Sequence, residues 1–348
     1  MDLDALDALL TAEVDTLEAA APSDPAFAGF FGELRDFLTA GGKRLRPQFL
    51  WCGFRAAGGD PGASDAVLPA AAAVELVHAC ALIHDDVMDS SPLRRNRPTA
   101  HETFAAAHLE SGWAGDPRHF GLSAAIMLGD LALVVADDLF VRSDVGAEGL
   151  AAAFVEFTRM RVEVVEGQYL DLVDGNRAQG DTTTALHVAS LKTAKYTVER
   201  PLRVGACLAG ADAAVLEGLS DFGEPLGIAF QLRDDLLGAF GDEAATGKPA
   251  GIDFREGKHT YLVALAREVA TPEQKTILDA CLGKADLDPA GVDAVRGVLV
   301  TTGAVAAAEA RIDALAAQAL GVLARLEAPA DVEAALADLA HRCVHRAF

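Results

Sequence analysis

Apolar residues recur with a period of about 3.6 residues through almost the whole chain, and this period limits the fold more than any other feature. Alanine and leucine dominate, and β-branched residues never cluster as a strand would require. The breaks between periodic stretches are too short and too unbiased to be interdomain linkers. The sequence therefore predicts a single all-α domain over 1–348. Its helices are expected at 2–20, 43–57, 63–89, 120–142, 147–172, 183–209, 212–238, 303–326 and 330–346.

Two proline positions and one stretch depart from this helical pattern. Pro201 and Pro225 lie inside otherwise helical segments, where a proline is expected to kink or interrupt the helix. The stretch 240–258 is rich in glycine and charge. Its composition fits a mobile lid and a plain surface loop equally well.

The chain is strongly acidic, with 52 Asp and Glu against 29 Lys and Arg and a formal net charge of −23. This balance argues against nucleic acid and against an anionic membrane surface as partners. No signal-peptide pattern opens the chain, and Glu75, His78 and Asp130 interrupt the apolar runs that approach membrane-spanning length. The five cysteines form no C-x-x-C pair, as expected for free thiols in a reducing compartment. We therefore expect a soluble, cytoplasmic protein without a membrane span.

Paired aspartates stand at the ends of two apolar helical stretches, 149 positions apart (234 − 85). Buried or half-buried carboxylate pairs are costly unless they hold a cation. Asp85 and Asp89 are one helical turn apart and share a face, as Mg²⁺ ligands that leave room for water would. A solvated helix end explains this motif alone equally well. A second pair, Asp234 and Asp235, favours metal, because two facing helices can bracket one polyanion.

Basic residues are scarce, yet they gather in two short segments. Three lie within 43–46 and three within 94–97, so a merely solvated face is a weak explanation for them. Arginine offers a planar fork for phosphate oxygens and lysine a point charge. Together with the aspartates they indicate a diphosphate bridged by Mg²⁺. The residues are Lys43, Arg44 and Arg46 in the first segment, and Arg94, Arg95 and Arg97 in the second.

These motifs, in this order, resemble those of the trans-isoprenyl diphosphate synthases, the polyprenyl synthetase family. The resemblance runs from about Gly41 to Ala264. Within the family, the chain is most like a geranylgeranyl diphosphate synthase. Residues 41–47 resemble G-G-K-x-x-R-P, and residues 85–89 the first aspartate-rich motif. The further matching residues are Gln168, Asp171, Lys192, Thr193, Phe230, Gln231, Asp234, Asp235, Lys248 and Lys258.

The resemblance implies a helical bundle around a central cavity. It also implies an enzyme that condenses isopentenyl diphosphate with an allylic prenyl diphosphate, using Mg²⁺ with three ions expected. By resemblance Thr193 and Gln231 stabilise the allylic cation. The implied metal ligands are Asp85, Asp86, Asp89, Asp234 and Asp235. The implied ligands of isopentenyl diphosphate are Lys43, Arg46, His78 and Arg95, and those of the allylic diphosphate are Arg94, Lys192, Lys248 and Lys258.

The chain departs from the family pattern at two positions. The second aspartate motif usually has a third aspartate where this chain has Gly238, so metal binding there rests on Asp234 and Asp235, with Asp242 as a further candidate. The usual R-R-G becomes Arg94-Arg95-Asn96. Asparagine tolerates a left-handed backbone almost as glycine does, so the turn is expected to survive.

Histidines and several other polar residues on apolar helices can have a structural role in packing instead of a role in ligand binding. A lone histidine on such a helix is commonly a satisfied core residue. His78 lies seven residues before Asp85 on the same helical face, which favours a ligand role, whereas His84 keeps the structural explanation. The residues expected to serve packing or the helix surface are Tyr196, Glu199 and Arg203.

The product is expected to be geranylgeranyl diphosphate, with a longer polyprenyl chain as second choice. In the family, bulky residues four and five positions before the first aspartate stop growth early. Here these positions are the small Ala81 and Cys80, with Met127 or Leu131 as a later stop. Replacing Cys80 with Phe is expected to shorten the product.

Two other functions remain open at this point, and the sequence also predicts an assembly state. A class I terpene cyclase also uses D-D-x-x-D, but it needs no second diphosphate site. A non-catalytic partner subunit of a heteromeric prenyl synthase would be expected to have lost aspartates or lysines that this chain keeps. The amount of continuous apolar helix predicts a homodimer.

Overall fold

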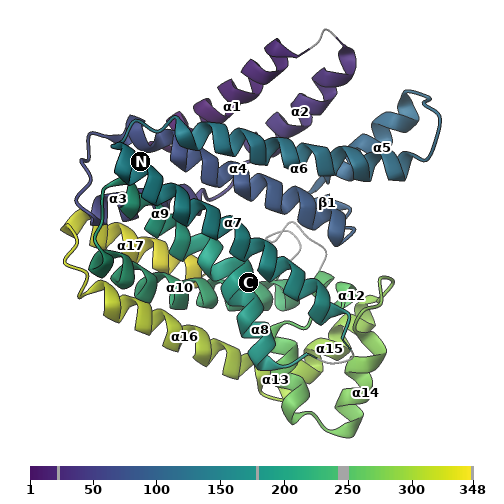
Figure 1. Ribbon diagram of the computed structural model, residues 1–348. Coiled ribbons are helices and arrows are strands. Elements are labelled where there is room, and N and C mark those ends of the chain that lie inside the picture. Colours follow the sequence, from purple (N-terminus) through teal and green to yellow (C-terminus); the bar gives the residue numbers. More distant parts are fainter. Residues whose placement is uncertain (22–23, 178–179, 242–250, 346–348) are drawn as a thin grey trace. The chain divides into compact units, whose positions relative to one another are not determined.

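A computed structural model of the chain describes residues 1–21, 24–177, 180–241 and 251–345 (Figure 1). Helices make up nearly all of its regular structure, which confirms the all-α prediction. The described part contains one short exception, a two-stranded antiparallel hairpin of β1 (Leu93–Arg94) and β2 (Arg97–Pro98).

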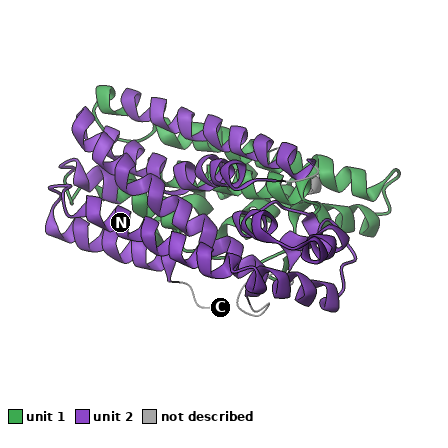
Figure 2. Cartoon of the chain, turned by 90° about the horizontal axis from the view of Figure 1, so that it is seen from below, with its two compact units in different colours: residues 1–51, 60–150 green, residues 52–59, 151–348 purple. Residues whose placement is uncertain are grey.

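The chain divides into two compact units, which Figure 2 shows in separate colours. Unit 1 comprises 1–51 and 60–150, and unit 2 comprises 52–59 and 151–348. The expectation of a single domain over 1–348 stays a prediction.

Unit 1 is built around α4 (Ser64–Met88), which packs against α6 (Pro117–Val141). Apolar residues surround α4 on every side, as in a helix at the centre of a core. Contrary to the sequence expectation, α4 is long and apolar enough to cross a membrane, but 67% of that stretch is buried within the protein. The other helices of this part are α1 (Leu3–Ala20), α2 (Pro25–Thr39), the first half of α3 (Leu45–Ala56) and α5 (Ala100–Glu110).

Unit 2 is built around α10 (Ala213–Phe240), which packs mainly against η1 (Ala189–Glu199) and α16 (Ala304–Leu323). A continuous helical run over 182–208 consists of α8 (Thr182–Val188), the π-helix η1 (Ala189–Glu199) and α9 (Arg200–Leu208). The remaining helices are α7 (Ala147–Gly175), α12 (Ile252–Glu256), α13 (Tyr261–Val269), α14 (Pro272–Cys281), α15 (Pro289–Thr301), α16 (Ala304–Leu323) and α17 (Ala330–Val344).

Long periodic segments were predicted within a few residues, and short helices were missed. The missed helices are α2, α5 and those from α12 to α15. Neither proline ends its helical run. Pro225 lies inside α10, while Pro201 lies in the first turn of α9 directly after the π-helix. A proline has no N–H to donate four residues back, which favours the changed register of η1 just before it. All five cysteines are free, as predicted, and four of them are buried.

Two glycines let α10 approach η1 backbone to backbone. A Cβ built on Gly227 would lie 2.4 Å from the Cα of Ala194, and one on Gly223 would lie 2.8 Å from the Cα of Glu199. Both distances are too short for any side chain. The two glycines are four residues apart, so they share one face of α10.

Replacing Gly227 with alanine is predicted to destabilise the protein by about 1–3 kcal/mol, because the added methyl group overpacks a backbone contact. Gly297 in α15 is the matched control, since a Cβ there would meet nothing within 4 Å. The same replacement at Gly297 is expected to stabilise by about 0.5–1 kcal/mol through helix propensity. Denaturant unfolding measures both, and equal effects of the two variants would contradict the close packing.

Candidate active site

The first aspartate group lies at the carboxyl end of α4 in unit 1. Asp89 caps the helix, with its N–H donating to the carbonyl of Asp85 at 2.8 Å. Asp86 is only 1% exposed, and both of its carboxylate oxygens accept hydrogen bonds from Arg94, at 2.7 and 2.8 Å. Asp85 lies 3.5 Å from the same guanidinium. Asp86 is therefore a fixed partner of Arg94, whereas Asp85 and Asp89 remain half-buried beside it.

The β1–β2 hairpin positions the arginines that follow this group. Arg95 and Asn96 form its two-residue turn with φ angles of 52° and 60°, as a type I′ turn requires. The expected left-handed backbone at Asn96 is thus present. Thr99 ties the base of the hairpin, because its hydroxyl donates to the carbonyl of Ser91 at 2.8 Å. The turn aims Arg95 at the carbonyl of Gly41, to which its guanidinium donates.

His78 lies in a strongly positive part of unit 1. Burial lowers the pKa of its imidazole well below the usual value, and the nearby charges of Arg46, Arg94 and Arg95 lower it further. The side chain is therefore neutral in the folded protein. Arg46 and Arg95 thus lie close enough to His78 to act on it, as does Arg94, which was expected at the other diphosphate, and an anion would relieve the repulsion among these arginines.

Arg44 serves a different purpose from its neighbours in the sequence. It is only 7% exposed and forms ion pairs with Glu75 at 2.6 Å and Asp7 at 2.8 Å. Its guanidinium also donates to the carbonyl of Leu38. It ties α1 and α4 to the end of α2 and is not open to a ligand. Lys43, by contrast, is exposed.

The second aspartate group lies near the carboxyl end of α10 in unit 2. The pKa of Asp235 is raised to about 8 by burial, and then by the negative charges of Asp253, Asp234 and Asp171. The amide of Gln231 donates to Asp235 at 2.7 Å and partly opposes this shift. Several carboxylates thus crowd together with too little positive charge, which is the situation that a bound divalent cation relieves.

The K-T pair lies on η1 and contacts both α7 and α10. Lys192 forms a 2.7 Å ion pair with Asp171 on α7, and the Thr193 hydroxyl donates to the Gln231 side-chain oxygen at 2.5 Å. Gly167 on α7 allows this approach, because a Cβ there would lie 2.4 Å from the backbone nitrogen of Lys192. Thr193, Gln231 and Asp235 are therefore joined by hydrogen bonds, while Lys192 and Asp171 form a separate ion pair.

The lysines after α10 are only partly within the described chain. Lys258 forms an ion pair with Glu256 at 2.8 Å. Lys248 and Asp242 lie outside the described residues, together with the rest of 242–250 in the expected lid. The segment 252–256, expected to be part of that loop, is helical.

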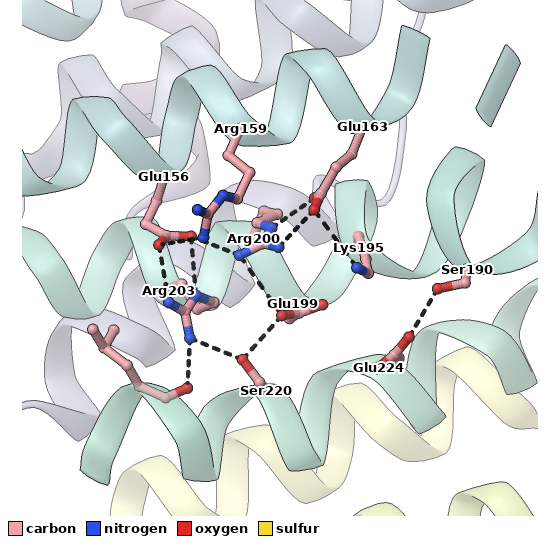
Figure 3. A network of polar contacts seen from close by, with 11 residues as sticks. Glu156, Arg159, Glu163, Ser190, Lys195, Glu199, Arg200, Arg203, Ser220 and Glu224 are labelled. Carbon is pink, nitrogen blue, oxygen red and sulfur yellow. Dashed lines mark hydrogen bonds and ion pairs between the residues drawn. The ribbon is translucent and has the colours of Figure 1, made fainter. Parts of the chain in front are cut away.

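A buried ionic network holds η1 in place, and Figure 3 shows it at close range. Arg200 donates to both carboxylate oxygens of Glu163 at 2.7 Å and to Glu156 at 2.7 Å. Arg203 binds both oxygens of Glu156 at 2.9 Å and also reaches Ser220 on α10 at 3.0 Å. The network joins α7, the junction of η1 with α9, and α10 around the helix that carries Lys192.

Comparison with known proteins gives a family match for this chain. A family model described as Polyprenyl synthetase matches residues 31–299. The chain belongs to the polyprenyl synthetase family. It is accordingly a trans-prenyltransferase, as its motifs predict.

Individual members of the polyprenyl synthetase family resemble most or all of the chain. A geranylgeranyl diphosphate synthase of Sulfolobus acidocaldarius is 36% identical over 71% of this chain and 69% of that protein. A geranylfarnesyl diphosphate synthase of Aeropyrum pernix is 32% identical over 84% and 86%. The crystal structure of a geranylgeranyl pyrophosphate synthase from Corynebacterium glutamicum, complexed with isoprenyl diphosphate and magnesium, has a TM-score of 0.93 and 41% identity over all of both chains.

The sequence reading of this polyprenyl synthetase missed the ionic network. Glu199 and Arg203 are expected to serve packing or the helix surface. Glu199 is 6% exposed, which agrees with packing, but both residues also belong to the network, in which Glu199 lies 3.8 Å from Arg200 and Arg203 binds Glu156. A signal was present, because Glu156 and Glu163 are seven residues apart on one face of α7. Arg200 and Arg203 are likewise three apart. Tyr196 is buried, as expected.

Replacing Arg200 with alanine is predicted to destabilise the protein by about 3–5 kcal/mol, because it leaves Glu163 buried without its main cation and removes one of the two arginines that bind Glu156. Asp338→Ala is the control, since Asp338 is 64% exposed and pairs with Arg342 one helical turn away. That change should cost roughly 0.3–0.5 kcal/mol. Urea unfolding compares the two. A loss for Arg200→Ala as small as that of the control would show that the network adds no stability.

Proposed function

We propose that the chain condenses isopentenyl diphosphate with an allylic prenyl diphosphate to an all-trans prenyl diphosphate, in a reaction that requires Mg²⁺. The observation that carries this proposal is the crowding of carboxylates around Asp235, whose pKa of about 8 marks a site short of positive charge. The arginine cluster around His78 supports a separate site for an anionic substrate.

The carboxylates suit Mg²⁺ in their chemistry. Among the described residues, no three His, Cys, Asp or Glu side chains already form a closed metal site. Mg²⁺ commonly keeps several waters and takes one or two carboxylates plus substrate phosphates, so an open arrangement fits it. Asp85 and Asp89 would hold the ion in unit 1, and Asp234 and Asp235 in unit 2. Three ions remain the expected number. When bound, Mg²⁺ would supply positive charge that these carboxylates hold against the departing diphosphate.

Asp86 takes a different role from the one its motif implies. Arg94 occupies both of its carboxylate oxygens, so we assign Asp86 to orienting that guanidinium instead of first-line metal binding. Burial disfavours the charge of Arg94, but the hydrogen bonds to Asp86 and the charges of Asp85 and Asp89 outweigh it and raise its pKa. Arg94 stays charged and fixed, as binding of the allylic diphosphate requires.

The remaining residues divide between two substrates. Lys192 and Lys258 are held by Asp171 and Glu256 and would pass to the allylic diphosphate, together with Lys248. Thr193 and Gln231 present oxygen atoms for the allylic cation, and the hydrogen bond from Gln231 to Asp235 fixes the orientation of its amide. Lys43, Arg46 and Arg95 would hold isopentenyl diphosphate. The neutral His78 would offer a hydrogen bond instead of a charge. A terpene cyclase has no use for this second site.

A homodimer is part of the proposal, with a second copy as the partner. Exposed apolar residues recur every seven positions on α6, at Met127, Val134 and Val141. A similar stripe on α7, also with a spacing of seven, consists of Val155, Val162 and Tyr169. Each stripe is long enough to pack against another helix. Sedimentation velocity distinguishes such a dimer from a monomer.

We place the enzyme in the cytoplasm.

Replacing Asp85 or Asp234 with alanine is predicted to lower turnover by at least ~10²-fold, the scale of removing electrostatic stabilisation from a transition state. The assay combines isopentenyl diphosphate, an allylic primer and Mg²⁺, with and without EDTA. Asp293→Ala, at a site 75% exposed on α15, is the control and should keep full activity. Full wild-type turnover in excess EDTA would rule out the metal mechanism.

The product is proposed to be geranylgeranyl diphosphate. Ala81 lies one helical turn before Asp85 on the same face of α4 and is half-buried, so a growing chain finds no bulky residue there. Cys80 is 8% exposed and its sulfur lies 3.7 Å from His84 Nδ1, which places it on another face. Met127 is 63% exposed, which argues against it as the stop within a single chain.

Ala81→Phe is therefore predicted to shorten the product by filling the space below Asp85, with mass spectrometry as the measurement. Cys80→Phe, the change expected from the sequence, is a weaker test, because it overpacks a buried position. A wild-type product of farnesyl diphosphate alone, or an unchanged product from Ala81→Phe, would contradict the assignment.

A further inference from the structure

His259 joins the segment between α12 and α13 to the end of α7 in unit 2. Its Nδ1 lies 3.3 Å from Oδ2 of Asp174, and the two side chains are only 9% and 4% exposed. Gly180 also packs against the histidine, because a Cβ built there would lie 2.4 Å from the Cβ of His259. Any side chain at position 180 would therefore displace His259. The imidazole occupies an enclosed place that its neighbours leave for it.

The residue before His259 is Lys258, which lies between two helices and belongs to neither. The N–H of Lys258 donates to the carbonyl of Asp253 at 3.0 Å. Thr260 begins α13 as its N-cap, and its hydroxyl oxygen accepts from the N–H of Val263 at 3.3 Å. The backbone is thus fixed on either side of His259. The contact of the imidazole with α7 fixes the residue in between, which is the one that follows Lys258.

The same helix also holds the other described lysine that we assign to the allylic diphosphate. Asp174 lies three residues after Asp171 on α7, and Asp171 forms the 2.7 Å ion pair with Lys192. Residues three apart share one side of a helix. One side of α7 therefore contacts Lys192 through Asp171, and the residue next to Lys258 through Asp174.

Stability alone is a weak reason for this contact. Burial raises the pKa of Asp174, and the positive charges of His259 and Arg177 oppose that rise only in part. Replacing a buried ion pair with apolar side chains of similar size is often neutral or even stabilising. What such a pair does provide is a defined position, because few arrangements of the chain leave both of its groups with a partner.

We propose that His259 is a positioning residue, which through Asp174 ties Lys258 to α7 so that Lys258 and Lys192 can bind the same diphosphate. This proposal rests on the proposed function, in which both lysines bind the allylic diphosphate. It gives a role to a residue that the matched motifs do not include. His259 itself does not contact the substrate and acts through its neighbour in the chain.

The experiment measures binding of an allylic diphosphate to the full chain with Mg²⁺ by calorimetry, in the absence of isopentenyl diphosphate. His259→Leu keeps a side chain of similar size and loses the contact with Asp174. It should weaken binding by ~10-fold or more, because misplacing a binding group by about 1 Å has effects of this order. His259→Asn should restore most of the affinity, since its amide nitrogen can take the place of Nδ1. A variant His259→Asn that binds no better than His259→Leu would overturn the proposal.

Binding of isopentenyl diphosphate is the readout that a merely structural role would also change. It should stay at the wild-type value in His259→Leu, and an equal loss for both substrates would contradict positioning. Thr182→Ala is the matched control, because the hydroxyl of Thr182 donates to Glu268 on α13 at 2.7 Å on the surface. That variant should bind the allylic diphosphate as wild type does. A loss as large as that of His259→Leu would refute a specific role of His259.

A double-variant cycle tests whether His259 acts through Lys258. Contacts that act as one unit are not additive, so His259→Leu should cause no further loss in a chain that already carries Lys258→Ala. Additive losses would overturn the proposal. If Lys258→Ala alone binds as wild type does, the role of Lys258 is wrong and the proposal fails with it. A loss in Lys258→Ala with none in His259→Leu refutes only the role of His259. A wild-type chain that binds both substrates and forms no product refutes the function, whereas these binding results still decide on His259.

Discussion

Unit 2 depends on five charges, four of them buried, that satisfy one another only when three helical segments are in register. Glu156 and Glu163 come from α7, Glu199 and Arg200 from the junction of η1 with α9, and Arg203 from α9. A buried ion pair contributes little net stability, but a misplaced partner leaves a charge without water or a counterion. Alternative packings of these helices are therefore strongly disfavoured. The network favours one arrangement of these helices, and this arrangement fixes the position of Lys192 and Thr193 on η1.

Glycines complete this arrangement by setting distances that charges alone cannot set. Gly167, Gly223 and Gly227 bring α7 and α10 against the backbone of η1. Because backbone contacts are stiffer than side-chain contacts, Lys192 and Thr193 project from a helix with little freedom to shift. Positioning of this kind is what a reaction between two diphosphates demands, since little covalent chemistry is left to the protein. The π-helix η1, which bears Lys192 and Thr193, is thus among the most tightly enclosed helices of its unit.

The sequence allowed the long helices and most of the candidate site to be predicted, for identifiable reasons. A period of 3.6 residues marks α4 and α10 wherever they are packed, and paired aspartates at their ends are rare enough to stand out. The sequence did not distinguish Arg44 from Arg46 by charge pattern alone, although the family motif assigns a ligand role only to Arg46. The ion pairs of Arg44 with Glu75 and Asp7 are seen only in the structure. The sequence also offered no means to find Asp253 as the neighbour of Gly238. That relation depends on the path of the chain between α10 and α12, which no local pattern encodes.

The π-helix has a consequence for how this chain tolerates insertions and deletions. Each residue of an α-helix turns the chain by roughly 100°. A π-helix takes more residues for each turn without ending the helical run, so the eleven residues of η1 turn the chain by less than eleven α-helical residues would. Deleting one residue there need not break the helix. It would instead rotate Lys192 and Thr193 relative to Arg200 and Arg203, so that either the pair on η1 or the arginines of α9 lost their alignment. The length of η1 thus sets the angle about the helix axis between Lys192 and Thr193 and the arginines of the ionic network.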